Sequence, residues 1–347
     1  MTATRATRSR GWRSVSSGSG RPEPPSCDRA PPLGRRVAYD RLVPDLPNPL
    51  GDAPDEFDPS PGWARLRDYL SLVRFSHTVF ALPFATLGAV LAWRSTPFEW
   101  PHLVGFLVCM VAARTAAMAF NRLVDQEIDA KNERTATREL PSGKLTPGQV
   151  KRLIAVSIAA FVLGTTCFLP NWWPLAAGPL VLAVLLGYSL AKRWTPLCHY
   201  WLGFALGLSP VCAYVAITAE LAAAPIWLGV AILCWVGGFD ILYACQDEAF
   251  DREAGLRSIP ARFGRRRSFT IARLSHAATI VSLLAFGLSA GFGPIFAIGL
   301  ALITLALAYE HWIVGPDDLR RVGVAFFQMN ALVSFGVLAF GVADVIW

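Results

Sequence analysis

Apolar runs of about 20 residues, each long enough to cross a bilayer core as a helix, recur from Val73 to Trp347 between short polar loops. The runs lack the polar face that a surface helix of a soluble protein presents. The sequence therefore predicts an all-α, polytopic membrane protein. The predicted spans, about nine by this pattern, cover residues 74–93, 102–122, 151–169, 173–190, 198–217, 225–245, 268–289, 292–313 and 322–345.

The first 60 residues follow a different pattern. They are rich in Arg, Ser, Pro and Gly, and they contain no apolar core of a secretory signal peptide. Such a composition does not bury a hydrophobic core. We therefore expect residues 1–60 to be a disordered extension and residues 61–347 to form the transmembrane domain. The Arg- and Ser-rich start weakly resembles a mitochondrial transit peptide, but a solvated tail or an early start codon explains it better.

Composition and charge agree with a membrane protein. Charged residues make up only 16% of the chain, although its net charge is +7. The basic residues outside the N-terminal segment lie in every second loop, whereas the other loops hold only Arg94. By the positive-inside rule, the N-terminus is predicted to be cytoplasmic and the C-terminus to lie outside a bacterial inner membrane. No basic surface with interleaved aromatic residues is present, so we expect no nucleic-acid partner.

Cysteine and histidine spacing does not indicate a zinc site. The seven cysteines form no Cys-x-x-Cys pair, and the five histidines are scattered. The cysteines, most of which lie inside predicted spans, are therefore expected to be buried free thiols.

Acidic side chains gather at the end of the second predicted span. Asn121, Asp125 and Asp129 follow one another at intervals of four residues, which places them on one face of a helix. Two carboxylates one turn apart repel each other, and a divalent cation removes that repulsion. Oxygen ligands suit Mg²⁺, which keeps several waters and often bridges to phosphate.

A second acidic group ends the sixth predicted span, with Asp240, Tyr243, Asp247 and Asp251. Asp240 lies within an apolar run, where an unpaired charge costs about 2.5–3.5 kcal/mol. One such group alone could be a solvated helix end. Two groups on the same predicted side, each followed by a basic loop, favour a functional site.

The neighbouring loops supply positive charge suited to a diphosphate. For most basic residues there, membrane topology is a sufficient explanation. The residues that we expect to bind substrate, together with Asn121, are Arg134, Arg138, Lys144, Lys192 and Arg193.

At these residues the sequence resembles the UbiA superfamily of intramembrane prenyltransferases. Asn121, Asp125 and Asp129 match its first acidic motif, and Asp247 and Asp251 match its Asp-x-x-x-Asp motif. Further similarities, over a region of about residues 65–347, lie in Asp240–Ala244, Arg134–Lys144, Tyr188–Arg193 and Ser258–Gly264. The resemblance implies a UbiA-like bundle of about nine helices that uses Mg²⁺.

The resemblance also implies transfer of a polyprenyl group from an allylic diphosphate to an aromatic acid in quinone biosynthesis. The most similar branch is that of the 4-hydroxybenzoate polyprenyltransferases. Mg²⁺ would be held by Asp125 and Asp129 and by Asp247 and Asp251. Arg74 is a candidate for holding the acceptor carboxylate. The candidate catalytic residues are Asp125, Asp129, Asp240, Tyr243, Asp247 and Asp251.

Two departures from that branch leave the acceptor open. Arg122 follows Asn121 where most of the branch has Asp, and the stretch around Arg74 lacks the usual Lys-Pro. Both resemble relatives that prenylate 1,4-dihydroxy-6-naphthoate in the futalosine route to menaquinone.

A transporter is the alternative from another class, because intramembrane acids also mark ion pathways. Transport sites favour the bilayer midplane, whereas these acids lie at one predicted membrane face. The expected partners are polyprenyl diphosphate, an aromatic acceptor and the lipid bilayer, and the sequence indicates no obligate protein partner.

Overall fold

The computed structural model describes residues 67–72 and 81–347, without the side chains of 324–326. Regular structure within these ranges is helical, apart from an isolated β-bridge between Gly315 and Asp318. Residues 1–60 and Arg74 lie outside the described residues, so what the sequence predicts for them stays a prediction.

Eight helical segments are long and apolar enough to cross a membrane, which confirms the predicted all-α membrane fold. A shorter apolar helix, α2, is described only from Leu82, whereas its predicted span begins at 74. The helices of the bundle are α2 Leu82–Trp93, α3 Trp100–Val124, α5 Pro147–Thr165, α6 Trp173–Ala191, α7 Cys198–Thr218, α8 Ala223–Ala244, α11 Arg265–Ala290, α12 Pro294–Ile313 and α14 Asn330–Ile346.

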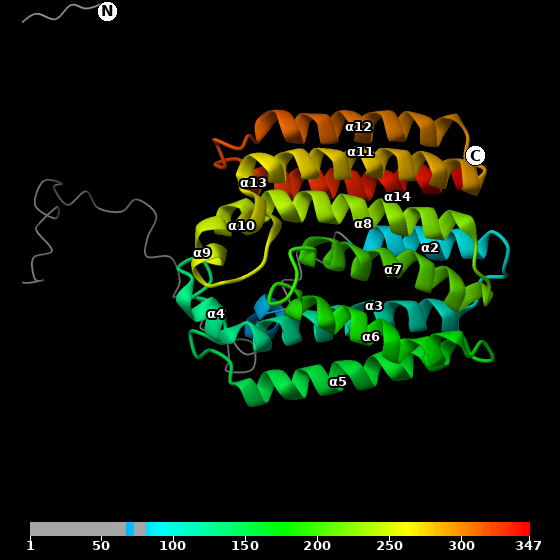
Figure 1. Cartoon of the computed structure of the whole chain (residues 1–347). Coiled ribbons are helices and arrows are strands. Elements are labelled where there is room, and N and C mark those ends of the chain that lie inside the picture. The colour runs from blue at the N-terminus through cyan, green and yellow to red at the C-terminus, as the bar shows by residue number, and fades with distance from the viewer. Residues whose placement is uncertain (1–66, 73–80) are drawn as a thin grey trace, which may run out of the picture. The chain divides into compact units, whose positions relative to one another are not determined.

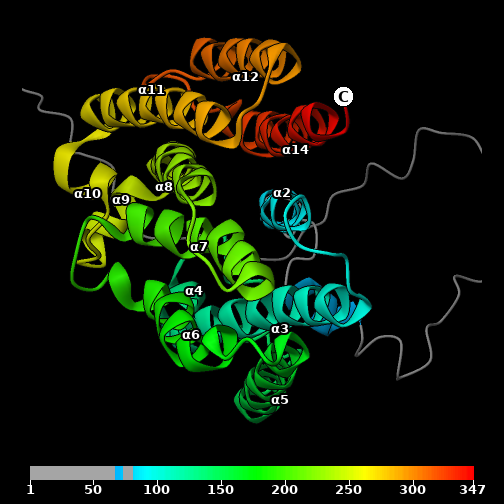
Figure 2. The ribbon, with the colours of Figure 1, turned by 90° about the vertical axis from the view of Figure 1, so that its right-hand side faces the viewer.

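The long helices run side by side, and three short helices gather at one end of the bundle, at the left in Figure 1. These are α4 (Gln126–Lys131), α9 (Glu248–Glu253) and α10 (Ile259–Phe263). Seen along the helix axes, α8 lies between α7 and α11 (Figure 2). The ends of α3 and α8, which carry the two acidic groups, therefore lie at the same end of the bundle.

Both acidic segments differ from the single continuous helices that the spacing predicts. At Asp125 the backbone leaves the helical conformation (φ −95°, ψ 6°), and α4 begins at the next residue. A 3₁₀ turn, Cys245–Asp247, separates α8 from α9 in the same way. The Asp129 amide nevertheless donates to the Asp125 carbonyl at 2.7 Å, so the two carboxylates stay about one turn apart.

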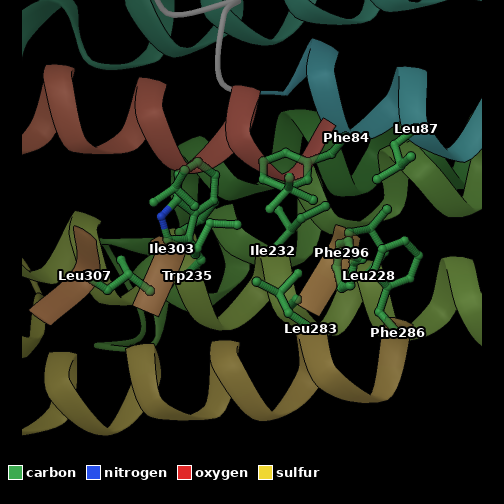
Figure 3. Packing of buried hydrophobic residues seen from close by; sticks show 14 of the residues in the cluster. Phe84, Leu87, Leu228, Ile232, Trp235, Leu283, Phe286, Phe296, Ile303 and Leu307 are labelled. Carbon is green, nitrogen blue, oxygen red and sulfur yellow. The ribbon is translucent and has the colours of Figure 1, made fainter. Parts of the chain in front are cut away.

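The largest apolar core joins α2, α8, α11, α12 and α14 (Figure 3). Trp235 lies in this core, and its ring centroid is 5.2 Å from that of Phe84 and 5.0 Å from that of Phe239. Large apolar side chains also cover the outside of the bundle, among them Leu180 and Leu288, which are 70% and 73% exposed. Such an exterior suits a lipid environment, where apolar side chains need no cover.

Glycines bring α7 and α8 into close contact. A Cβ added at Gly207 would lie 2.5 Å from the Gly229 carbonyl oxygen, and one added at Gly203 would overlap the Leu233 backbone. Small residues at such a seam allow two membrane helices to pack backbone to backbone. Because the two helices are antiparallel neighbours, the same seam leads to His199 on α7 opposite Asp240 on α8.

Candidate functional site

A cavity of about 230 Å³ lies among the polar residues at the end of the bundle that carries α4 and α9. Its walls come from α3, α4 and the following loop, the end of α6, the start of α7, the end of α8 and α9. Most of the predicted site residues line it, namely Asn121, Asp125, Asp129, Arg134, Arg138, Lys192, Arg193, Asp240, Tyr243, Asp247 and Asp251.

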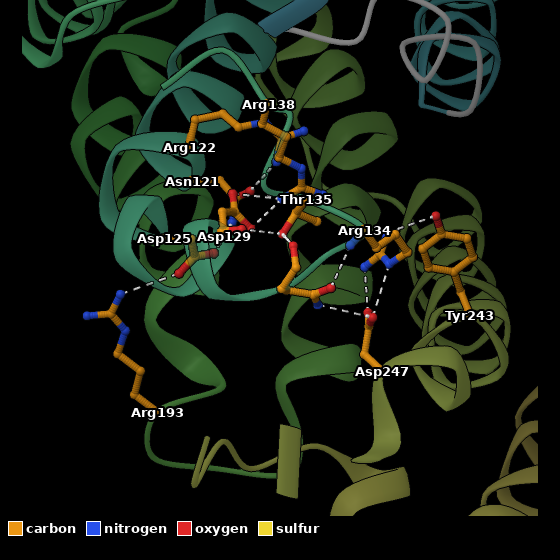
Figure 4. A network of polar contacts seen from close by, with 11 residues as sticks. Asn121, Arg122, Asp125, Asp129, Arg134, Thr135, Arg138, Arg193, Tyr243 and Asp247 are labelled. Carbon is orange, nitrogen blue, oxygen red and sulfur yellow. Dashed lines mark hydrogen bonds and ion pairs between the residues drawn. The ribbon is translucent and has the colours of Figure 1, made fainter. Parts of the chain in front are cut away.

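Two of the carboxylates form close ion pairs with arginines of the loop after α4 (Figure 4). Arg138 Nη1 donates to both oxygens of Asp129, at 2.7 and 2.8 Å. Arg134 donates to Asp247 through Nε at 3.0 Å and Nη2 at 2.5 Å. Its guanidinium also stacks 5.5 Å over the Tyr243 ring and donates to the Tyr243 hydroxyl at 3.3 Å.

The other two motif carboxylates meet cations from the end of α6. Arg193 Nη2 lies 3.3 Å from Asp125 Oδ1, and Lys192 Nζ lies 3.6 Å from Asp251 Oδ2. Asn121 Nδ2 donates to Asp125 Oδ2 at 3.0 Å. The loop after α4 and the end of α6 thus hold the acids of both motifs around one cavity.

Positive charge near Asp125 does not fully offset the cost of its burial. Burial is the main cause that raises the pKa of this carboxyl, and the charge of Asp129 adds to it, whereas Lys192 and Arg193 act in the opposite direction. A further cation bound beside Asp125 would stabilise its charged form.

Asp240 has a different kind of partner. His199 Nδ1 lies 2.6 Å from Asp240 Oδ2, and the His199 side chain is fully buried behind the cavity wall. The Ile259 amide, at the start of α10, donates to His199 Nε2 at 3.3 Å. One histidine therefore connects α7, α8 and α10.

Several lining residues were not among the predicted site residues. Asn132, next to Glu133 in the loop after α4, donates to Asp247 Oδ1 at 3.4 Å. Arg122 is buried and donates to the Asn121 side chain at 3.3 Å. Their positions beside an acidic motif were the available signal. His199 lay in the predicted fifth span with no sequence pattern that linked it to Asp240.

Lys144 and Arg74 are not brought to the cavity by the described structure. Lys144 is exposed and absent from the cavity wall, and Arg74 lies outside the described residues. The assignment of both as substrate-binding residues stays a prediction.

The donor set of this cavity suits a hard divalent cation. Its wall offers carboxylate oxygens of both motifs, and the buried Asp251 Oδ2 accepts no hydrogen bond. Across residues 67–72 and 81–347, no group of three or more His, Cys, Asp or Glu side chains is placed to hold an ion by itself. Any ion here would complete its coordination with water or ligand oxygens, as Mg²⁺ commonly does.

Comparison with known proteins gives one family and consistent relatives. A profile described as the UbiA prenyltransferase family matches residues 81–332. A 4-hydroxybenzoate octaprenyltransferase of Marinomonas sp. is 31% identical over 79% of this chain and 96% of its own length. The mitochondrial 4-hydroxybenzoate polyprenyltransferase of Caenorhabditis elegans is 32% identical over 65% of this chain, and the match spans 62% of that protein.

Solved structures agree with the sequence matches. The apo structure of a UbiA homolog from Aeropyrum pernix K1 superposes with a TM-score of 0.70 at 32% identity, covering 78% of this chain and 98% of that one. A UbiA homolog from Archaeoglobus fulgidus bound to GPP and Mg²⁺ has the same fold, with a TM-score of 0.60 at 19% identity over 81% of this chain and all of that one.

Proposed function

Since this chain belongs to the UbiA prenyltransferase family, we propose that it transfers a polyprenyl group from an allylic diphosphate to a ring carbon of 4-hydroxybenzoate. The relative solved with bound GPP supports the donor class, and the names of the curated relatives support the acceptor. The chain is an integral membrane prenyltransferase.

The observation that carries this proposal is the charge balance of the cavity. Five carboxylates line it, at Asp125, Asp129, Asp240, Asp247 and Asp251, against five cations, at Arg122, Arg134, Arg138, Lys192 and Arg193. A wall that is formally neutral does not by itself attract a diphosphate. Divalent ions on the acids would make the wall positive and match the anion.

We assign one Mg²⁺ to Asp125 and Asp129 and another to Asp247 and Asp251, with Asn121 beside the first. What such ions supply is charge neutralisation of the departing diphosphate, which favours cleavage of the allylic C–O bond.

The protein's own groups bind the diphosphate and orient it. Arg134, Arg138, Lys192 and Arg193 already face the cavity, each paired with an acid. When the acids are neutralised, these donors become available to phosphate oxygens, for which the fork of an arginine is well shaped. Held in this way, the diphosphate leaves among donors that stabilise the negative charge developing on it.

The remaining wall protects the electrophilic prenyl carbon and accepts a proton. Apolar lining residues, among them Leu202, Ala244 and Phe250, limit the access of water. The new C–C bond forms at a ring carbon next to the acceptor hydroxyl as the C–O bond to diphosphate breaks. We assign Asp240 as the base that removes the proton from that ring carbon, which restores aromaticity.

The test also includes a second acceptor, 1,4-dihydroxy-6-naphthoate. Arg122 follows Asn121, which is one of the two departures from the 4-hydroxybenzoate branch, and the buried Arg122 lines the cavity. An added cation could favour a different acceptor. We further propose that the chain lies in a bacterial inner membrane with its N-terminus in the cytoplasm.

The proposal is tested in membranes without endogenous prenyltransferases, supplied with labelled polyprenyl diphosphate and either acceptor. We expect a prenylated product with 4-hydroxybenzoate that is absent after chelation with EDTA and returns when Mg²⁺ is added. Product with the naphthoate alone would reassign the acceptor. Absence of product with both, in a folded protein that also fails to bind the diphosphate with Mg²⁺, would refute the proposal.

A further inference from the structure

We infer that His199 is a positioning residue of the transfer reaction, which holds Asp240 as an oriented carboxylate at the cavity wall. This inference rests on the proposed function for its kinetic consequences. Its geometric part concerns the free protein.

The hydrogen bonds of His199 identify which ring nitrogen carries the proton. A backbone amide only donates, so the Ile259 amide, 3.3 Å from Nε2, requires Nε2 to be an acceptor without a proton. A neutral imidazole then carries its proton on Nδ1. Nδ1 therefore donates to Asp240 Oδ2 over 2.6 Å.

This arrangement orients Asp240 without placing a full positive charge against it. The other four carboxylates of the cavity pair with Arg or Lys. Such cations favour the charged carboxylate and reduce its affinity for a proton. A neutral N–H donor fixes the carboxylate but lowers its affinity for a proton less than a cation does. A carboxylate that accepts a proton in the reaction needs to keep that affinity.

The nearby charged groups do not replace this histidine. Lys192 belongs to another ion pair, with its Nζ 3.6 Å from Asp251 Oδ2. Cys198 precedes His199, and its thiol donates to the Arg257 carbonyl at 3.6 Å. Tyr243, one turn from Asp240, accepts from Arg134.

Two features of the fold hold the histidine in place. The glycine seam at Gly203 and Gly207 sets the register of α7 against α8. Ile259 is the first residue of α10, so its backbone amide has no acceptor within its own helix. His199 fills that need, so the position of Asp240 is connected to the loop that closes this end of the bundle.

Two amide substitutions separate the two hydrogen bonds of His199. In His199→Asn the amide nitrogen takes the place of Nδ1 and still donates to Asp240. In His199→Gln the amide oxygen reaches the place of Nε2 and still accepts from Ile259, but Asp240 loses its donor. Misplacement of a reacting group by about 1 Å can reduce a rate about 100-fold.

The experiment compares these variants of the full chain in nanodiscs. We expect His199→Gln to reduce kcat at least about tenfold with an unchanged KM for the polyprenyl diphosphate. His199→Asn should recover most of the loss. In an Asp240→Asn background, His199→Gln should have no further effect, because the interaction is already removed. His102→Gln, at the opposite end of α3 from Asn121, is the matched control and should keep full activity.

Equal losses in the two His199 variants, or a full additional loss in the Asp240→Asn background, would reduce His199 to a structural role and overturn the inference. If the wild-type protein makes no product, the proposed function fails separately. The inference is then decided by ¹⁵N resonances of labelled histidine. A proton on Nδ1 whose resonance shifts in Asp240→Asn supports it, and a proton on Nε2 refutes it.

Discussion

At the scale of single residues, the cavity is lined by ion pairs between the motif acids and basic side chains. Each acid of the two motifs already has a cation within 4 Å, from 2.5 Å for Arg134 and Asp247 to 3.6 Å for Lys192 and Asp251. An unpaired buried charge strongly destabilises a protein, and these pairs avoid that cost. A ligand that brings divalent cations and phosphate oxygens would give each acid a metal ion, and each Arg or Lys a phosphate oxygen, in place of its present partner.

Replacement of Asp247 by asparagine tests the role of the acids. Asp247→Asn keeps the size of the side chain and removes its charge, so we expect prenyl transfer to fall at least about 100-fold, since charge stabilisation at the leaving group is lost. Asp318→Asn is the control. Asp318 is an exposed acid with its own partner, Arg320 at 2.7 Å, outside the cavity. Equal activity of the two variants in the labelled-product assay would contradict the assignment.

The shape of Arg134 also matters, beyond its charge. Its guanidinium contacts Asp247 through two nitrogens and stacks on Tyr243. Lysine preserves the charge but neither contact. We expect Arg134→Lys to lower kcat/KM for the diphosphate about tenfold, whereas Arg320→Lys on the exposed loop leaves it unchanged. A value for Arg134→Lys that equals wild type would mean that charge alone is needed there.

At the scale of elements, close helix packing positions the site. Along α7 and α8 the glycine seam runs from Gly207 and Gly229 to Gly203, and the same register brings His199 to Asp240. Bulk added anywhere on this seam would push apart two helices that both contribute residues to the cavity wall. We therefore expect stability and activity to change together there.

Substitution of alanine for Gly207 measures this coupling. The new Cβ would lie 2.5 Å from the Gly229 carbonyl oxygen, so the helices must separate. Overpacking of this kind typically costs about 1–3 kcal/mol, and we expect a lower unfolding temperature in detergent. Gly336→Ala on α14 is the matched control, because its Cβ would meet Ile303 at an ordinary 3.7 Å. An unchanged unfolding temperature for Gly207→Ala would show that α7 and α8 can separate without loss of stability.

The elements also show which features could be read from the sequence. Apolar runs predict membrane helices because lipid requires every backbone group to be paired within a helix. The spacing of Asp125 and Asp129 predicts their proximity because it depends on one turn of local structure. Lys144 and His199 illustrate the opposite case. Whether a loop lysine reaches a cavity, or a histidine on one helix meets Asp240 on another, depends on loop path and helix register, which arise only from packing.

At the scale of the whole domain, charge is distributed unevenly between the two ends of the bundle. The cavity end carries the Arg- and Lys-containing loops around α4, α9 and α10, whereas the described loops at the opposite end hold Arg94 as their basic residue. From the positive-inside rule we predict that the cavity end faces the cytoplasm. A diphosphate, which does not cross a bilayer unaided, would then reach the cavity from the cytoplasmic side.

Cysteines added one at a time at the two ends of the bundle test this orientation. Ser142 lies in the loop between α4 and α5, Glu220 lies between α7 and α8, and both are exposed. In intact cells a membrane-impermeant maleimide should label Glu220→Cys, and it should label Ser142→Cys only after the membrane is permeabilised. The wild-type chain, in which Cys198 and Cys245 are buried and the other four described cysteines are partly exposed, gives the labelling background that is subtracted. The reverse pattern would place the cavity on the outer side and contradict delivery of the diphosphate from the cytoplasm. Agreement would connect the loop charges, which direct insertion, with the site that they surround.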